Sequence, residues 1–305
     1  MRFRWHNWTA AILVVVACVA IAGGLVWNRS RKVPSLADRM NRLPAGTSAV
    51  YLDFESLRKS GLMALLSGQN VTEDADYRAF VASTGFDYRA DLDSALVGFA
   101  NSEVFIVATG RFDWKAIQAH TKRSNGICRN GVCRMPATTP KRVVSFTPLH
   151  NSMIGMAVST NDWAVLKLQD NIPNLLPPPD APVWAGGFGE ALRNNESLPA
   201  GTKLFVKALG DAKVVTLGLQ SSGDGAELRL RAECATEGAA GGLESQLRGV
   251  TEVFRKYLEN VQQKPNSSDL SGILTSGTFA REGSVVTGRW AVQRGFLEKL
   301  LSGQL

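Results

Sequence analysis

The longest uninterrupted apolar stretch of the sequence runs from Trp8 to Trp27 and contains no charged residue. A helix of this length rises about 30 Å, which matches the hydrocarbon core of a bilayer. Tryptophan stands at both ends, where its amphipathic ring suits the membrane–water interface. The pattern therefore predicts a tail and single transmembrane helix over residues 1–28, anchored by Trp8 and Trp27, with membrane lipids as the first partner.

Three alternatives exist for this stretch. A buried helix of a soluble core rarely stays uncharged for so long. A cleaved signal peptide fits the basic tail and apolar start. A lipoprotein lipidated at Cys18 fits the box-like segment that ends there, but Val19–Trp27 stays apolar where a lipoprotein continues into a polar tether. We expect an uncleaved span.

Beyond the span, apolar positions alternate with polar ones in short runs that predict an α+β fold with mostly antiparallel sheets. A capped helix at 35–43 forms a juxtamembrane collar within 29–46. Two halves follow, 47–169 and 183–305, separated by a Pro-rich linker at 170–182. Each half has the order strand, helix, hairpin, helix, hairpin, helix, with an additional cysteine hairpin in the first half. This order suggests an internal duplication.

The additional hairpin is centred on Asn130-Gly131, the strongest signal for a two-residue type I′ turn. That turn places Cys128 opposite Cys133, where a disulfide forms with little movement of the backbone. Zinc would require further soft ligands, and the sequence offers no second cysteine pair. Cys234 falls on the apolar face of its strand and is expected to be a buried free thiol.

The cysteine pair also bears on topology. The basic flank at 29–42 would place the large domain in the cytoplasm by the positive-inside rule. The rule is weak for long domains, however, and a disulfide favours an oxidising compartment. We therefore expect the domain on the extracytoplasmic, periplasmic side.

The net charge of +7 belongs mainly to the membrane flanks, because residues 1–42 hold seven of the 34 basic residues and one of the 27 acidic ones. No nucleic-acid footprint remains. Residues 70–103 are acidic and residues 111–142 are basic. These segments are either solvated faces that neutralise each other or a docking surface for a protein partner. The docking interpretation selects four basic residues: Lys122, Arg123, Arg129 and Arg134.

The sequence offers no set of residues for catalysis, cofactor binding or metal binding. Its three histidines are His6, His120 and His150, and they are far apart in the chain. Asp87, Asp91 and Asp93 have a spacing that calcium could use, but a solvated acidic loop explains them as well. We therefore expect a protein that is not an enzyme and holds no cofactor.

One resemblance bears on function. Leu43, Pro44, Ala45 and Thr47, then Tyr51 and Asp53, then Leu57, Arg58, Ser60 and Gly61 resemble an LPAxT…YxD…LRxSG opening. That opening is found in uncharacterised bacterial proteins with a membrane anchor and an extracytoplasmic domain. The resemblance covers about a third of the chain and implies no catalytic residue.

The sequence thus predicts a single-pass, membrane-anchored interaction or structural protein. One form of this prediction is an accessory subunit of a larger respiratory or photosynthetic membrane complex. The alternative is an extracytoplasmic ligand carrier or enzyme with a pocket between the two halves.

Overall fold

The computed structural model describes residues 34–60, 63, 75–100, 102–170, 172–178, 180–192, 200–223 and 225–301. The predicted transmembrane helix at 1–28, with Trp8 and Trp27, lies outside these residues. Among the residues described, no helix is long and apolar enough to cross a membrane.

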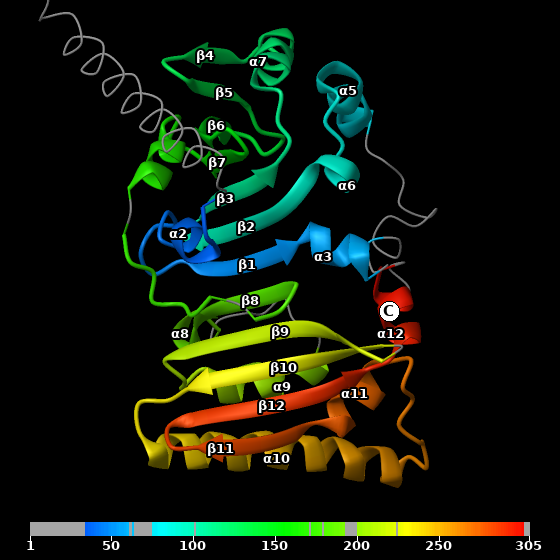
Figure 1. The fold of residues 1–305 in the computed structure, drawn as a ribbon. Coiled ribbons are helices and arrows are strands. Elements are labelled where there is room, and N and C mark those ends of the chain that lie inside the picture. Colours follow the sequence, from blue (N-terminus) through cyan, green and yellow to red (C-terminus); the bar gives the residue numbers. More distant parts are fainter. Residues whose placement is uncertain are drawn as a thin grey trace, which may run out of the picture.

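The strands of the described residues form one 12-stranded sheet in the order β11-β12-β10-β9-β8-β1-β2-β3-β7-β6-β5-β4 (Figure 1). All of its strand pairs are antiparallel, so the predicted α+β class with antiparallel pairing is confirmed. The strands are β1 Ser48–Asp53, β2 Leu92–Ala100, β3 Glu103–Gly110, β4 Ile127–Arg129, β5 Val132–Pro136, β6 Val143–His150, β7 Met153–Ser159, β8 Val183–Phe188, β9 Val214–Ser222, β10 Gly225–Glu233, β11 Thr278–Glu282 and β12 Val285–Val292.

Most helices begin at a side chain that accepts a hydrogen bond from the first turn. Ser35, Asp53, Asp87, Asp113, Thr236 and Asp269 act in this way. The helices are α2 Leu36–Met40, α3 Phe54–Lys59, α5 Ala75–Thr84, α6 Tyr88–Asp91, α7 Trp114–Arg123, the 3-10 helix η1 Ala164–Gln169, α8 Gly189–Leu192, α9 Ala200–Leu209, α10 Glu237–Asn260, α11 Leu270–Ser276 and α12 Arg294–Leu301.

Two of these helices differ from expectation. The sequence predicts a helix after β7 that starts at Asp162. The helix observed there, η1, begins at Ala164 and is 3-10, and the Asp162 carboxylate pairs with Arg134. The sequence did not predict α9, whose first turn contains Gly201 and β-branched Thr202, both poor helix formers.

The cysteine hairpin matches its prediction. In β4 and β5, Cys128 stands opposite Cys133 and Arg129 opposite Val132, and the two cysteines form a disulfide. The other described cysteine, Cys234, is a free buried thiol. Burial raises its pKa, and the nearby Asp211 adds to the increase.

One cross-strand row of residues defines the two faces of the sheet, because directly paired residues in antiparallel strands point to the same side. Successive pairs form the row Gly155, Val107, Leu96, Tyr51, Trp184, Gly218, Arg229, Arg289 and Thr278. We call the side that carries this row the α2 face. The opposite side, which carries Leu230 and Val286, is the α10 face.

On the α2 face, the collar helix α2 covers the first half of the sheet. Met40 and Leu43 pack on Tyr51 and Leu96, as the predicted apolar side of the collar requires. Arg39 is also buried there, and its guanidinium donates to the hydroxyl of Ser94. η1 and Leu176 complete this layer.

The connection between the halves is bound to the end of α2. The backbone N–H of Ile172 donates to the carbonyl of Asn41 at 2.8 Å, and the N–H of Asn174 donates to the Asn41 side chain at 3.0 Å. The described residues of this connection, 172–178 and 180–182, form neither helix nor strand. The connection therefore belongs to the layer over the first half.

Candidate functional site

The four basic residues predicted to dock a partner do not act as one set. Arg134 pairs with Asp162 at 2.8 Å and lies 4.4 Å over the ring of Trp163. Arg123 donates to backbone carbonyls of α5 and α7. Lys122 and Arg129 are exposed and contact no polar partner among the described residues. Two of the four cations are therefore already engaged within the chain.

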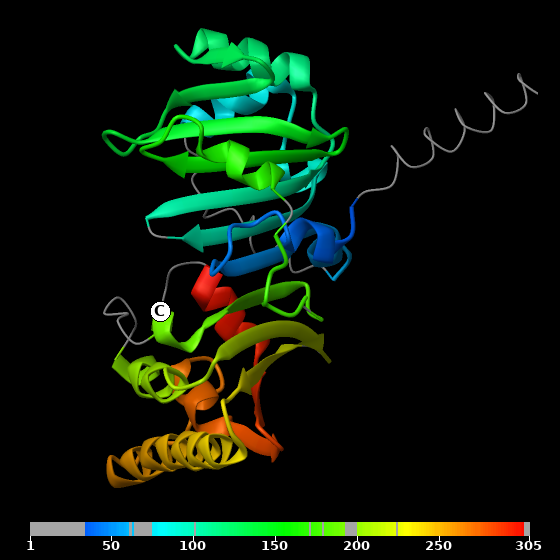
Figure 2. The ribbon, with the colours of Figure 1, turned by 90° about the vertical axis from the view of Figure 1, so that its left-hand side faces the viewer.

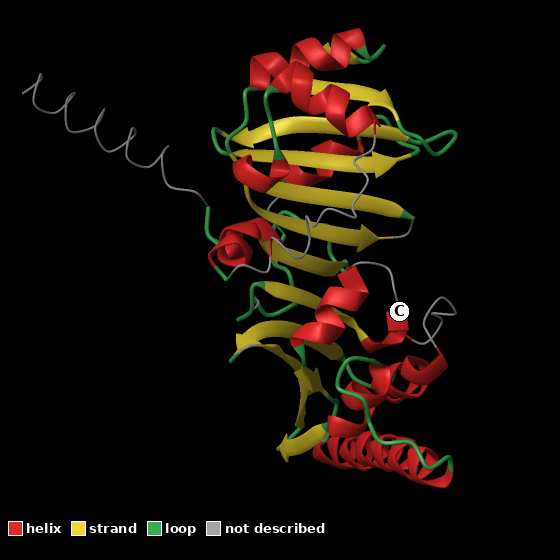
Figure 3. Ribbon diagram, turned by 90° about the vertical axis from the view of Figure 1, so that its right-hand side faces the viewer, coloured by secondary structure: helices red, strands yellow, loops and turns green. Residues whose placement is uncertain are grey.

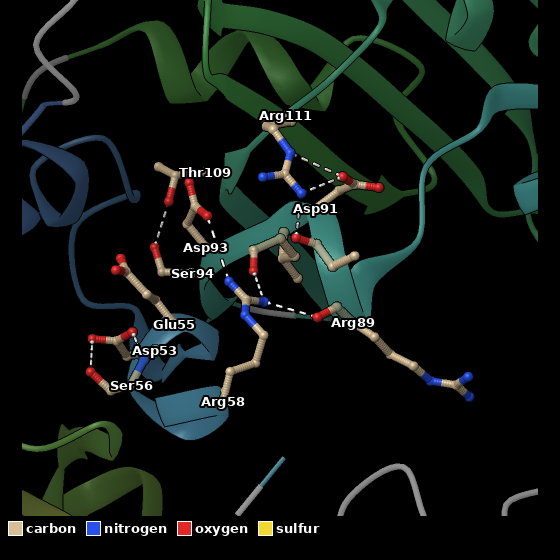
Figure 4. Close-up of polar contacts among 12 residues, drawn as sticks. Asp53, Glu55, Ser56, Arg58, Arg89, Asp91, Asp93, Ser94, Thr109 and Arg111 are labelled. Atoms are coloured by element: carbon tan, nitrogen blue, oxygen red, sulfur yellow. Dashed lines mark hydrogen bonds and ion pairs between the residues drawn. The ribbon is translucent and has the colours of Figure 1, made fainter. Parts of the chain in front are cut away.

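The acidic and basic segments meet in a polar cluster at the start of β2, where one ion pair joins them (Figure 4). Arg111, from the basic segment, binds the carboxylate of Asp91 at 2.8 Å and the carbonyl of Ala90 at 2.7 Å. The backbone N–H of Asp87 and the guanidinium of Arg111 lower the pKa of Asp91. The cluster joins α6 to the end of β3 and has no unpaired carboxylate to offer a partner.

In the same cluster, Arg58 of α3 donates to the carbonyl of Leu92 at 2.7 Å and lies 3.7 Å from Asp93 (Figure 4). Glu103, farther along, accepts from Lys167 and Ser159, both at 2.7 Å. Burial tends to raise the pKa of Glu103, but these hydrogen bonds and the Lys167 charge outweigh it and lower the pKa. These carboxylates hold elements of the first half together.

The aspartates considered for calcium have separate partners. Asp87 caps α6 and accepts from the hydroxyl of Tyr77 at 2.9 Å, whereas Asp91 and Asp93 face arginines. Burial, with the hydrogen bond to Asp87, raises the pKa of Tyr77 to about 12. Within the described part of the chain, no three metal-ligating side chains form a group that could hold an ion.

The two described histidines lie in different surroundings. His120 Nδ1 is 2.6 Å from the hydroxyl of Ser83, and its ring meets Phe80 edge-on. Burial, aided by the charge of Arg123, lowers the pKa of His120. His150 lies instead in a shallow depression beside Phe112 and Trp114. Both histidines have serine neighbours, but no carboxylate of the described residues contacts either ring, so the Ser83–His120 pair lacks the third group that orients a catalytic base.

The second half of the sheet is covered on one side only. α9, α10 and α11 pack on the α10 face through Phe205, Leu243, Leu247 and Leu274. Figures 2 and 3, from opposite sides, show these helices on one side of the lower half and α2 on the other side of the sheet. No helix of the described chain covers the α2 face in the second half.

Along the cross-strand row, the α2 face changes from covered by other residues to bare. Leu96, Tyr51 and Trp184 are buried, whereas Arg229 and Arg289 in the same row are exposed. The neighbouring row repeats this change from buried Thr216 to exposed Arg231. The bare part of the α2 face is thus a polar surface with three arginines at its centre.

These arginines border a groove of about 280 Å³. Its floor includes Gly218 and Thr216, and Pro177, Pro178 and Ala181 of the connection form one wall. Gly218 is required at its position, because a Cβ there would lie 2.9 Å from the Cβ of Ala181. We call the groove with Arg229, Arg231 and Arg289 the arginine groove, and it is the candidate functional site.

The charges in the arginine groove are unevenly compensated. Arg229 pairs with Glu227, and Arg231 pairs with Glu233 at 2.8 Å. Arg289 forms no ion pair or hydrogen bond with any described residue, yet it stands directly opposite Arg229. Like charges directly opposite each other destabilise an antiparallel pair. Glu227 offsets the charge of Arg229, so Arg289 is the arginine of the groove that no described residue neutralises.

The docking residues predicted from the sequence do not include this site, although the sequence contains a signal for it. The alternation in residues 226–234 assigns Leu228 and Leu230 to the interior, and it equally assigns Arg229 and Arg231 to the outer face. The sequence could not show that Arg289 would be their neighbour, because α10 and α11 separate the two strands in the chain.

Comparisons with known proteins inform the fold alone. No protein-family model matches the sequence, and no curated protein matches it. Among solved structures, crystal form I of TP0453 is similar, with a TM-score of 0.51 and 11% identity over 90% of this chain and 98% of that chain. Crystal form III of TP0453 gives 0.51 and 10% identity over 87% and 98%. At such identity the likeness extends to the mixed α+β arrangement and no further.

Proposed function

We propose that this chain is a single-pass, membrane-anchored extracytoplasmic protein that acts by binding a partner protein. The bare α2 face of the second half is its binding surface. The observation that carries this proposal is the contrast between the halves, because equivalent regions of the sheet are covered in the first half and bare in the second.

The equivalence of the halves rests on their strand order. Reading outward from the central β1–β8 pair, one direction is β1-β2-β3-β7-β6 and the other is β8-β9-β10-β12-β11. With β4 and β5 set aside, each half places its strands in the order first, second, third, fifth and fourth along the chain. A helix follows the third strand in both halves, α7 in the first and α10 in the second. We infer an internal duplication with its halves at 47–169 and 183–305. The strands β4 and β5 are then an addition to the first half.

The contrast then has a functional explanation. In the first half, α2 fills the position over the face with apolar side chains. In the second half no described helix occupies that position, and the residues beneath it are polar. An antiparallel sheet can simply expose a polar face to water. The uncompensated Arg289 and the walled groove go beyond what solvent exposure requires, and they support a binding surface.

The position of the anchor agrees with a partner at the membrane. α2 lies on the same face as the arginine groove, and the chain leads from α2 to the predicted span. A subunit of a membrane complex would therefore meet this face readily. The resemblance to anchored extracytoplasmic bacterial proteins supports the same placement.

The carrier and enzyme alternatives receive less support. The arginine groove is lined by strands of the second half and by the connection, whereas those alternatives need a pocket between the two halves. At about 280 Å³ it is also smaller than the roughly 300–1,000 Å³ typical of pockets that enclose a drug-sized ligand.

The test is co-purification from native membranes in mild detergent. Thr287→Trp places a large ring in the groove without altering a charge, and Thr138→Trp, in an exposed loop of the first half, is the matched control. We expect one protein, identified by mass, to accompany the native chain and the control and to be lost with Thr287→Trp. Retention of every companion by Thr287→Trp, at unchanged thermal stability, would contradict the proposal.

A further inference from the structure

We propose that the arginine groove binds an extended acidic segment of the partner, with carboxylates at alternate positions. The inference rests on the proposed function and names the chemistry of its surface. Three guanidinium groups lie on one bare face, and a guanidinium is a planar fork that binds a carboxylate through two hydrogen bonds. No described residue engages Arg289, whereas an acidic segment would replace Glu227 at Arg229 and Glu233 at Arg231.

The spacing of the arginines indicates the form of the segment. Arg229 and Arg231 are two residues apart on one strand, hence about 6.8 Å. Arg289 lies one strand further, at about 4.8 Å. An extended peptide repeats its side chains on one side at the same interval of about 6.8 Å. Two acidic residues separated by one residue therefore match Arg229 and Arg231, and a third carboxylate or a chain terminus can reach Arg289.

The surroundings favour a peptide over a membrane surface. Glu227, Glu233 and Glu282 share the face with the arginines and lie toward its rim. They would repel a continuous anionic lipid surface but leave room for a narrow strand between them. The groove is also recessed behind Pro177 and Pro178. A flat bilayer cannot enter it, whereas one or two side chains can.

The hydroxyl groups beside the arginines fit the same ligand. Thr287 is exposed next to Arg231; its hydroxyl donates to the carbonyl of Ala280 at 3.4 Å, and its oxygen can accept from a peptide N–H. Gln220, at the other end of the groove, already donates to the carbonyl of Asp180 and so holds the wall in place. The groove is therefore preformed, with Arg289 as its one arginine that no described residue engages.

The test uses the full-length chain in detergent micelles and a labelled peptide of alternating Thr and Glu, with the Thr–Gln peptide as the uncharged control. Fluorescence anisotropy should show binding of the Glu peptide that weakens as salt rises. The double variant Arg229→Glu with Arg289→Glu should weaken it by about tenfold or more. The control Lys256→Glu with Lys264→Glu makes the same charge change at exposed sites in α10 and the loop after it, and should bind as the native chain does.

Three results would overturn the inference. Equal binding of the Gln peptide would show that carboxylates are not recognised. Equal loss with the Lys256 and Lys264 control would show a general charge effect. Binding of anionic phospholipid vesicles by the full-length chain, abolished in the arginine variant while the peptide does not compete, would make a membrane surface the occupant.

The inference and the proposed function can fail separately. If the arginine variant keeps the native companion that Thr287→Trp loses, the face binds a partner through other groups, and only the acidic segment is wrong. If both variants keep it, the proposed function is wrong as well.

Discussion

Replacing Phe105 by Ala should lower the free energy of unfolding by about 3–5 kcal/mol, the usual range for a large aromatic side chain in a well-packed core. Phe105 is fully buried on the α2 face, and its cross-strand neighbours are the small Gly98 and Ala157. The two directly paired residues are too small to fill the cavity. Equilibrium urea unfolding in detergent micelles measures the loss.

Phe99→Ala is the matched control, because it removes the same ring from the neighbouring strand. Phe99 is 48% exposed. Its replacement should change the free energy of unfolding by less than about 1 kcal/mol. If Phe105→Ala lowers the free energy of unfolding no more than Phe99→Ala does, the core beneath α2 contributes little to stability.

The second large effect concerns the membrane. Leu13→Arg with Val16→Arg should move the protein from the carbonate-resistant membrane fraction to the soluble one. Each arginine at the centre of a span costs about 2.5–3.5 kcal/mol on insertion scales. Asn28→Arg adds a charge just outside the predicted span and should leave the protein in the membrane. Fractionation followed by immunoblotting separates these outcomes.

The disulfide reports topology in the same experiment. If the domain is extracytoplasmic, Cys128 and Cys133 resist alkylation in the native chain. They react in the variant with Leu13→Arg and Val16→Arg if that variant stays in the cytoplasm. Alkylation of both thiols in the native protein would contradict the predicted side of the membrane. A mature chain that starts at a lipidated Cys18 would replace the span with a lipoprotein anchor.

Local signals in the sequence predicted much of the fold. Asn130-Gly131 sets its own turn, Ser35 and Asp38 form a capping box, and alternation assigns the apolar side of β10. These features depend on neighbours within a few residues. The pairing of β1 with β8, Tyr51 opposite Trp184, joins distant parts of the chain into one sheet. Nothing local specifies that pair, so the sequence suggested two halves without their common sheet.

The candidate site was harder to predict for the same reason. Arg134 and Arg123 looked free in the sequence because their partners, Asp162 and the carbonyl of Ser83, are far away in the chain. Arg289 gains significance only from standing opposite Arg229 on a face that no described helix covers. Whether a charged side chain is engaged or available depends on tertiary contacts, which composition and spacing do not contain.

Site-specific photo-cross-linking in native membranes tests most directly whether the bare α2 face binds a partner. A photoreactive amino acid at Thr287 lies in the arginine groove, and one at Glu259, exposed on α10, reports the opposite side of the sheet. We expect a single cross-linked product from position 287, with a different protein that carries an acidic extended segment. We expect no such product from position 259. Cross-linking from position 259 alone, or from neither position, would contradict a partner on the bare face.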